Sequence, residues 1–312
     1  MILNTTAPSP SSALESPRCD LCGSADAVPY RTTRDHIYGT AGDWTLVRCA
    51  SCGLVYLSPR PTPDAIGAYY PDLDYHAFVP TRGLKSRVID WLHEREVRTI
   101  LSGFPYSARV LEIGCGTGEM LLKLRSHGAV VTGIEPNAAA AQLARDQHGL
   151  DVRTGILDTV TLDPASFDLI LMRYALEHVH SPSGTLKQIA ALLTPSGRAV
   201  FWVPNLASWD ARLFGSYWRG LDAPRHLYLF SPTTIQRLLA ESGLHLASIA
   251  YSGVPNDWAG SAEAWLRSRN PALANLLGMK NPIVLLAWSP VSLLAAALRH
   301  AGRMQVTATK RG

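Results

Sequence analysis

Hydrophobic positions in this chain follow an alternating rhythm from residue 109 onward. Short apolar runs take turns with stretches in which apolar residues recur at helical spacing. The runs are RVLEI, VVTGI, DVRTG, DLILM and RAVFWV, and the helical stretches include 117–127, 137–148 and 182–193. This rhythm predicts a doubly wound α/β fold, in which helices cover both faces of a mostly parallel sheet.

The last two predicted strands lie far apart in the sequence. After a helix at 232–242, LHLASIAYS ends near Ser252, whereas MQVTATK begins near Met304. The intervening stretch of about 50 residues is much longer than an ordinary hairpin loop. We therefore expect an apolar helical insertion at 254–303, followed by the last sheet strand and the C-terminus at 304–312.

The N-terminal part of the chain shows neither period. Residues 1–17 form a polar tail that we expect to be flexible, without the basic start and apolar run of a secretory signal. Residues 18–60 combine turn residues with short strands around two cysteine pairs, which predicts a small head. Residues 61–83 are rich in Pro, Tyr and Asp and are expected to link this head to the α/β domain at 84–253, which begins with an amphipathic helix at 84–102.

Composition excludes several classes of protein. With 47% hydrophobic and 17% charged residues and a mean hydropathy of +0.04, the chain is too apolar for a disordered protein and too polar for a polytopic membrane protein. The net charge of +4 is unevenly distributed, because residues 1–80 carry −3 and residues 254–312 carry +5. Phosphate binding needs Lys and Arg, so we expect no nucleic acid to bind the head. These features favour a cytoplasmic protein.

The strand that ends at Ile113 runs directly into a glycine-rich turn, Gly114-Cys115-Gly116-Thr117-Gly118. Glycines are needed where backbone turns tightly and approaches a ligand without a Cβ in the way. The spacing is G-x-G-x-G, whereas the dinucleotide-binding fingerprint is G-x-G-x-x-G. A Rossmann-type oxidoreductase with an unusual turn is therefore the alternative interpretation.

Two acidic residues accompany this turn. Glu112 precedes the first glycine, and Glu135 ends the next strand. A carboxylate accepts hydrogen bonds with both oxygens, so Glu135 is suited to a pair of ribose hydroxyls. Glu112 is placed to hold a cationic amino-acid group at the turn.

Four consecutive motifs resemble those of class I S-adenosylmethionine-dependent methyltransferases: VLEIGCGTGEM, VTGIEPN, FDLILMRYALEHV and LLTPSGRAVFWVPN. The resemblance covers roughly residues 84–253 plus the last strand, and it implies a seven-stranded sheet that binds S-adenosylmethionine. It places the methionine end of this cofactor at the glycine turn, the ribose at the end of the second strand and the adenine after the third. The implied cofactor-binding residues are Glu112, Gly114, Gly116, Gly118, Glu135, Pro136, Gly155, Ile156, Leu157 and Asp158.

The head carries two C-x-x-C pairs, Cys19 with Cys22 and Cys49 with Cys52, each followed by a glycine. Four thiolates favour a closed tetrahedral Zn²⁺ site with a structural role. Two disulfides or unrelated core thiols are the alternatives, and the lack of an export signal counts against the disulfides. The pattern is similar to the zinc-binding heads of bacterial sugar and natural-product methyltransferases. Zinc heads also occur in ribosomal-RNA methyltransferases, but the negative charge of this region disfavours that reading.

The insertion at 254–303 has more than one interpretation. It contains an uncharged run, 281–298, which approaches the length of a membrane span but is interrupted by Pro282 and Pro290. Both flanking strands are expected in one sheet, and a single crossing would leave the last strand on the wrong side of the membrane. Trp265, Trp288 and the basic charge suit a peripheral contact with anionic lipid. A lid over the active site or a dimer contact is at least as well supported, and the oligomeric state is left open.

Two segments are expected to form the wall around a small-molecule or glycan acceptor. The first is the linker, with Tyr70, Tyr75 and His76. The second is SYWRGLDAPRHLYLFS at 216–231, which offers the ring of Trp218 and the charged groups of Asp222 and Arg225. A purely structural loop, whose polar groups satisfy buried carbonyls, is the other interpretation of this second segment.

The resemblance also indicates where a proton is removed. In similar sugar C-methyltransferases a Glu-His pair after the fourth strand transfers the proton, and here that pair is Glu177 and His178. His226 is the rival base, and a structural role for both histidines stays open. The substrate class favoured is a sugar, glycan or natural product of bacterial biosynthesis. A quinone-type methyltransferase, an RNA methyltransferase or a zinc-ribbon binding module is the alternative.

Overall fold

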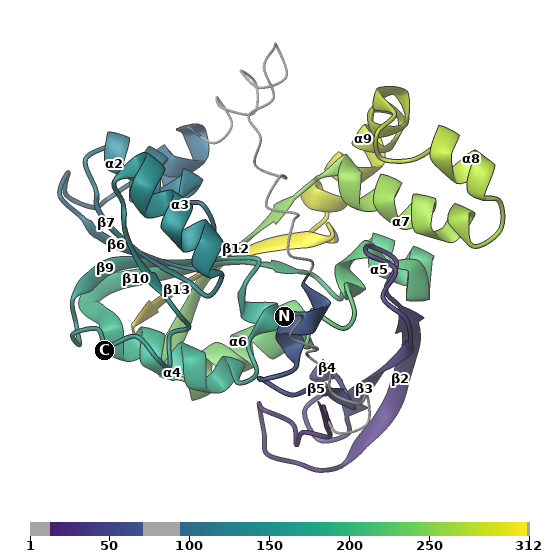
Figure 1. Cartoon of the computed structure of the whole chain (residues 1–312), viewed down its shortest axis with the longest axis horizontal. Helices are drawn as coiled ribbons and strands as arrows, with labels where there is room; N and C mark the ends of the chain where they lie inside the picture. The colour runs from purple at the N-terminus through teal and green to yellow at the C-terminus, as the bar shows by residue number, and fades with distance from the viewer. Residues whose placement is uncertain (1–12, 71–93, 311–312) are drawn as a thin grey trace, which may run out of the picture.

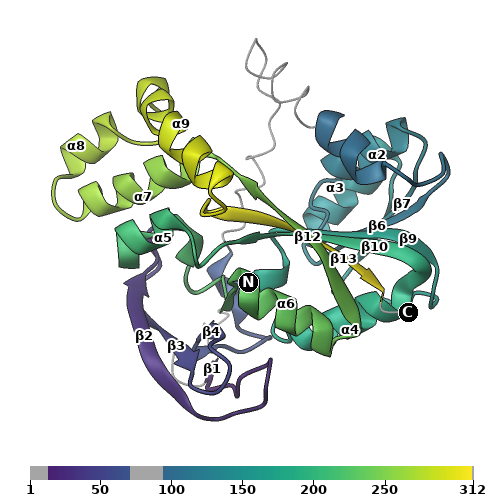
Figure 2. The same cartoon turned by 180° about the vertical axis from the view of Figure 1, so that it is seen from behind.

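The computed structural model describes residues 13–70 and 94–310 (Figures 1 and 2). Its main feature is a seven-stranded sheet in the order β12-β13-β10-β9-β6-β7-β8. Strands β6 to β10 run parallel, and β13 is antiparallel to both of its neighbours. The strands are β6 (Arg109–Ile113), β7 (Val130–Glu135), β8 (Asp151–Thr154), β9 (Phe167–Arg173), β10 (Leu193–Pro204), β12 (Leu244–Ser252) and β13 (Arg303–Lys310). The predicted fold class and every predicted strand of this sheet are confirmed. β10 begins at Leu193, five residues before its apolar run, and its register against β9 shifts between Leu193 and Arg198.

Helices cover both faces of this sheet. Figure 1 shows α2 (Glu119–Ser126) and α3 (Ala138–His148) on one face, with α4 (Pro182–Leu192) and α6 (Pro232–Glu241) on the other. Each face has its own apolar core, and the helical residues 94–101 pack into the core beside α2 and α3. Local signals set the helix starts, because Asn137, Ser181 and Ser231 each cap a helix with a side-chain oxygen.

The head is not a separate sheet. Its strands β2 (Ala27–Arg34), β3 (Asp43–Cys49) and β4 (Val55–Leu57) pair with β11 (Tyr228–Leu229), which comes from the larger domain. Tyr228 lies opposite Tyr56 in this pairing, and the Tyr228 hydroxyl accepts a hydrogen bond from Arg60 at 2.8 Å. A shorter ribbon joins β1 (Leu14–Glu15) to β5 (Arg60–Pro61), and a 3₁₀ turn, η1 (Ile66–Tyr69), follows. The segment at 216–231 therefore connects the head to the sheet.

The expected helical insertion is present between β12 and β13. It consists of α7 (Pro255–Arg267), α8 (Pro271–Leu276) and α9 (Pro282–Ala297), and it packs beside α5 (Trp209–Phe214). Pro282 occupies the first turn of α9, and Pro290 lies inside the helix without ending it. Among the described residues, no helix has both the length and the apolar character needed to cross a membrane. The insertion lies at the opposite edge of the sheet from β7 and β8 (Figures 1 and 2).

Candidate functional site

The glycine turn between β6 and α2 is shaped by backbone that only glycine adopts easily. Gly114, Gly116 and Gly118 all have positive φ, at 75°, 55° and 83°. A Cβ at Gly118 would overlap the side chain of Leu150, so this glycine is needed for packing. A Cβ at Gly116 would meet no atom within 4 Å, so the middle of the turn faces open space. The turn can therefore admit a ligand close to its backbone.

Glu135 and Glu112 are equally buried at this turn but differ in their partners. The Glu135 carboxylate accepts the backbone N–H of Gly116 at 2.8 Å and that of Asn137 at 2.8 Å. Glu112 is 3% exposed, and its Oε2 finds no hydrogen-bond partner within the described part of the chain. Burial raises the pKa of Glu112 to about 8, although the charge of Arg173 partly opposes this. An unpaired buried carboxyl beside an open turn fits a cationic ligand group, and the residues present thus fit S-adenosylmethionine.

The segment predicted to surround the adenine follows β8. The Gly155 N–H donates to the carbonyl of Glu135 at 3.0 Å, which ties this segment to the predicted ribose site. Ile156 is 50% exposed, Leu157 is buried and Pro136 is exposed. Asp158 instead accepts a hydrogen bond from the Gln188 side chain of α4. The structure therefore brings Gly155 next to Glu135 and turns the Asp158 carboxylate toward α4.

The predicted proton-transfer residues form one buried cluster. Glu177 and His178 lie in the 3₁₀ turn η3 (Leu176–His178) after β9, and the ring centroid of His226 is 4.7 Å from that of His178. His178 Nδ1 lies 3.0 Å from the carbonyl oxygen of Arg225, and His226 Nδ1 lies 2.8 Å from that of Gly220. Because a carbonyl only accepts, each Nδ1 carries the hydrogen and each Nε2 has a free lone pair.

Burial sets the protonation states of this cluster. It raises the pKa of Glu177 to about 8, and neither of its carboxyl oxygens has a partner among the described side chains and backbone. Burial and the neighbouring His226 lower the pKa of His178 to about 3. At neutral pH, Glu177 is therefore protonated and His178 is a neutral proton acceptor. Candidate ligand atoms of Glu177, His178 and His226 also lie within 4.8 Å of one another, a donor set that suits a divalent cation.

The predicted substrate wall is partly corrected. Arg225 is 1% exposed, and its guanidinium binds Asp35 of the head at 2.8 and 2.9 Å and Asp222 at 2.5 Å. Trp218 is 2% exposed and donates its indole N–H to Asp210 at 2.9 Å. Neither side chain is free to face a methyl acceptor, because both are buried and hydrogen-bonded to other residues of the protein.

The linker residues have different outcomes. The Tyr70 hydroxyl lies 2.9 Å from His178 Nδ1, so the structure brings this predicted residue to the proton-transfer cluster. Tyr75 and His76 lie outside the described residues. Three segments of chain thus meet around His178: η3, the loop before β11 and the start of the linker, which supplies Tyr70.

A hydrogen-bonded group of Tyr174, Arg303 and Asp257 next to the end of β9 was not identified from the sequence. Tyr174 has a φ of 53°, which is unusual for a bulky residue and is often found at functional sites. Its hydroxyl accepts from Arg303 at 3.1 Å, and Arg303 binds Asp257 of α7 at 2.6 Å. No local sequence pattern indicates this group, because its residues come from the end of β9, from α7 and from β13 and meet only in the folded chain.

The four head cysteines converge. Sγ of Cys19 lies 3.4 Å from that of Cys52, and Sγ of Cys22 lies 3.5 Å from that of Cys49. All four are free thiols whose sulfur atoms lie within 4.8 Å of one another. A tetrahedral zinc with bonds of about 2.3 Å would separate its sulfur ligands by about 3.8 Å. The donor set and its spacing therefore fit one such ion.

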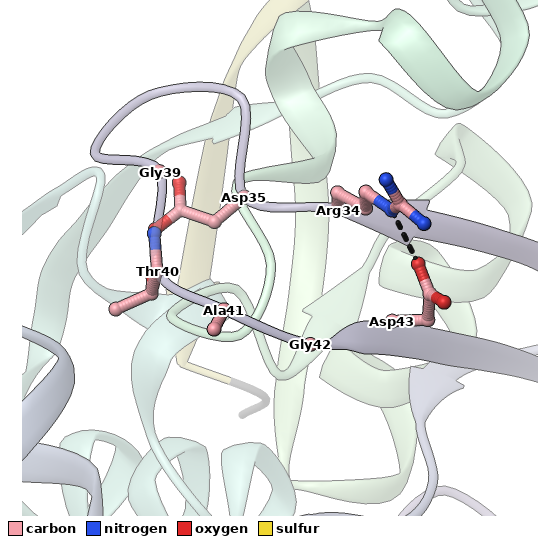
Figure 3. A pocket seen from close by; sticks show the side chains of 7 residues that line it. All are labelled: Arg34, Asp35, Gly39, Thr40, Ala41, Gly42 and Asp43. Carbon is pink, nitrogen blue, oxygen red and sulfur yellow. Dashed lines mark hydrogen bonds and ion pairs between the residues drawn. The ribbon is translucent and has the colours of Figure 1, made fainter.

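A cavity of about 290 Å³ lies in the loop between β2 and β3 (Figure 3). Arg34 pairs with Asp43 across it at 2.6 Å, as the dashed line shows. The Asp35 carboxylate accepts from the backbone N–H groups of residues 37, 38 and 40 and from Arg225. Its charged groups are already paired within the protein, so we assign the cavity no part in the candidate site.

Comparison with known proteins identifies the larger domain. The sequence model of a family described as "Methyltransferase domain" matches residues 82–249, more than half of the chain. The ubiquinone biosynthesis O-methyltransferase of Coxiella burnetii is 33% identical over 101 residues, which are 31% of this chain and 43% of that protein, so the match spans less than half of that relative's length. The protein of the same name from Xylella fastidiosa is 33% identical over 193 residues, 58% of this chain and 73% of that protein.

A solved structure supports the fold. The crystal structure of the cyclase SpnF is similar, with a TM-score of 0.54 at 20% identity over 81% of this chain and 98% of that chain. At this identity the likeness concerns the fold alone. The family match, the sheet order and the glycine turn with its buried acids agree, and the chain belongs to the class I S-adenosylmethionine-dependent methyltransferases.

Proposed function

We propose that the protein transfers the methyl group of S-adenosylmethionine to a sugar, glycan or natural product in bacterial biosynthesis. One observation carries this proposal: the glycine turn and the loop of the proton-transfer cluster touch. A Cβ on Gly114 would lie 3.1 Å from the Cβ of Ala175, which immediately precedes η3. A donor held at the turn would therefore lie next to a loop that can accept a proton.

The cofactor assignment follows the two buried acids. Glu112 holds the cationic amino-acid end, and Glu135 accepts the ribose hydroxyls while it keeps Gly116 in place. Pro136 and the segment from Gly155 to Leu157 border the remaining part. When bound, S-adenosylmethionine supplies an activated methyl group for in-line displacement.

His178 is the proposed base for an acceptor that must lose a proton. Its Nδ1–H is held by the Arg225 carbonyl, so Nε2 is the atom that receives the proton. Glu177, protonated and buried beside it, can orient the ring or exchange a proton with it. His226 is the competing base, because its free Nε2 lies in the same cluster, 3.8 Å from Glu177.

The head is proposed to bind one Zn²⁺ through Cys19, Cys22, Cys49 and Cys52. A site closed by four thiolates has no vacant position for a reacting molecule, so this ion would stabilise the head and take no part in the chemistry. The head in turn supports the catalytic loop, because Asp20 accepts from Ser181 and from the Ser183 amide at 2.9 and 2.7 Å.

A quinone-type small-molecule methyltransferase is the second candidate. It is favoured by the two relatives named for ubiquinone biosynthesis, which are each 33% identical to this chain over the matched residues. An RNA methyltransferase is disfavoured by the net negative charge of the head. A binding module that uses the fold only as a scaffold is disfavoured by the intact glycine turn.

A methyl-transfer screen separates these candidates. Donor labelled on the methyl carbon would be supplied with nucleotide sugars, lipid-linked glycans, phenols and quinols, and transfer to one class would identify the acceptor. Transfer to quinols alone would replace the favoured substrate class. Failure of the protein to bind S-adenosylmethionine by calorimetry would overturn the proposed function altogether.

A further inference from the structure

The exposed face of α9 consists only of apolar residues. Residues on this face recur at helical spacing over four turns: Ile283, Leu286, Ala287, Pro290, Leu293, Leu294, Ala297 and Leu298. Ile283 is 74% exposed, Leu286 72% and Leu293 61%. Leu276 of α8 is 64% exposed, so the neighbouring helix adds to this apolar surface. We call these residues of α8 and α9 the outer face.

The orientation of α9 is fixed by its inner side. Trp288 stacks on Trp258 of α7 with ring centroids 5.3 Å apart. At Gly253 a Cβ would lie 2.6 Å from the carbonyl oxygen of Ser292, so the helix lies directly against the end of β12. Ser292 is buried, and its hydroxyl donates to the carbonyl of Ser289 within the helix. The helix therefore turns serine inward and leucine outward, the reverse of the pattern for a helix that faces water.

Basic residues lie at the ends of the helices that form the outer face. Lys280 and Arg299 lie at the two ends of α9 and are exposed, as is Arg269 before α8. The two acidic residues of the insertion are already paired, Asp257 with Arg303 at 2.6 Å and Glu263 with Arg267 at 2.7 Å. None of the three exposed cations is paired with a carboxylate among the described residues.

We propose that the outer face docks onto an anionic membrane surface, with α8 and α9 lying in the interface. Apolar side chains flanked by cations match the boundary between acyl chains and anionic headgroups. Docking of a second copy is less compatible, because an antiparallel pair of α9 helices would bring Lys280 of each copy next to Arg299 of the other. A single crossing of the membrane is excluded, since β12 and β13 belong to one sheet and their connection must begin and end on the same side.

The docking surface is joined to the candidate site. Ser261 of α7 accepts the Arg219 N–H at 3.0 Å, and Arg219 begins η5 (Arg219–Leu221), the turn that leads to Asp222 and Arg225. This hydrogen bond connects the insertion to the loop before β11. The docking itself does not depend on the proposed methyl transfer.

Flotation of the full chain with vesicles tests the proposal. We expect binding to vesicles of phosphatidylcholine and phosphatidylglycerol at low salt, and weaker binding at high salt. Replacing Leu286→Gln together with Leu293→Gln should weaken partitioning at least about tenfold. Replacing Lys280→Gln together with Arg299→Gln should weaken binding about fivefold for each cation removed, and only on anionic vesicles.

A matched control is Val130→Gln, because Val130 is 58% exposed and lies in β7, beside the edge strand β8 and on the far side of the sheet from β12 and β13. It should bind vesicles like the unmodified protein, and thermal unfolding should show that every variant folds. The proposal is overturned if the unmodified protein does not float at low salt, or if the double leucine variant floats equally well. The proposal is also overturned if the unmodified protein is a dimer in solution and the double leucine variant is a monomer. The assay contains no methyl donor or acceptor, so its outcome is independent of the proposed function.

Discussion

At the scale of single residues, two equally buried carboxyl groups at the glycine turn differ in their hydrogen-bond partners. Glu135 is satisfied by two backbone N–H groups and so organises the turn, whereas Glu112 has an oxygen without a partner among the described residues. A buried acceptor left unpaired in the free protein is costly unless a ligand completes it. The contrast supports the proposed binding role of Glu112, whereas Glu135 shapes the turn in addition to its proposed contact with the ribose.

Replacing Glu135→Ala should weaken S-adenosylmethionine binding by about 1.5–3 kcal/mol, the range for a hydrogen bond to a charged group. The ribose would lose its acceptor, and the Gly116 N–H would lose its own. Isothermal titration calorimetry measures this directly, with Glu135→Gln as a control that keeps one acceptor and should bind with intermediate affinity. Binding as tight as that of the unmodified protein would remove Glu135 from the site.

Cofactor affinity should depend on pH through Glu112. Burial raises its pKa to about 8, so the free protein carries this carboxyl protonated at neutral pH. A bound ammonium group would ionise it and release a proton, so affinity should rise with pH below that value, by up to about tenfold per unit. Titrations from about pH 6 to about pH 7.5, below the pKa of an α-amino group, would show the slope. Glu112→Gln should flatten it; an unchanged slope in this variant would assign the proton to another group.

Turnover should fall about 100- to 10,000-fold in His178→Ala, because a positioned base contributes that much to the rate. Cofactor binding should stay nearly unchanged, since His178 lies outside the glycine turn. The comparison variant is His226→Ala, which removes the neighbouring imidazole of the same cluster. A loss below tenfold for His178→Ala with a larger loss for His226→Ala would identify His226, in the segment at 216–231, as the base.

At the scale of elements, the sheet of the head includes a strand from the larger domain. β11 completes the head sheet, and Leu227 immediately precedes it. The backbone N–H of Leu227 donates to the carbonyl of Glu177 at 2.8 Å, and its carbonyl accepts from the backbone N–H of Leu57 at 2.9 Å. The backbone of the proton-transfer loop is thus one residue away from the head sheet. Damage to the head is therefore expected to reach the candidate site through β11.

Metal analysis of protein purified without chelator should find one zinc per chain, and Cys49→Ser should lose it. Because metal binding to four thiolates contributes folding energy, the variant should unfold at lower temperature, with activity falling as a consequence. Cys115→Ser is the control for zinc content, since this buried thiol belongs to the glycine turn and lies outside the cluster. Protein without zinc and with unchanged thermal stability would contradict the proposed site.

At the scale of the whole molecule, a buried ion pair holds the head and the sheet together. Arg225 binds Asp35 across 190 residues of sequence, with both side chains almost fully buried. The Asp35 pKa is well below its usual range because Arg225 and Thr40 overcome the opposing effect of burial. Breaking such a pair leaves a buried charge behind.

Asp35→Ala should therefore lower the free energy of unfolding by about 3 kcal/mol, the lower end for a broken buried pair, because Asp222 still partners Arg225. Denaturant unfolding measures this change. Asp43→Ala, which removes an exposed pair with Arg34 in the same hairpin, should leave stability close to that of the unmodified protein. Equal effects of the two variants would mean that the pair does not couple head and sheet.

Much of this organisation could be predicted from the sequence, because the relevant signals are local. The period of apolar positions follows strand and helix geometry, so the seven strands and the insertion were placed correctly. The glycine turn with Glu112 and each C-x-x-C pair are also recognisable within a few residues, whereas Glu135 and the second cysteine pair are brought to them by the fold. Spacing along the chain is enough for these features because neighbouring residues stay close in space.

Only the tertiary structure decided what depends on contacts between distant segments. The residue types of Arg225 and Trp218 suggest contacts with the methyl acceptor. In the structure Arg225 binds Asp35 and Trp218 binds Asp210 instead. The sequence does not show this, because the burial of a side chain depends on the distant segments that pack on it. The same reason explains why β11 joins the head, why Tyr174 meets Arg303, and which side of α9 faces outward. Sequence periodicity determines that α9 is an apolar helix, whereas the packing of Trp288 and Ser292 determines that its leucines are exposed.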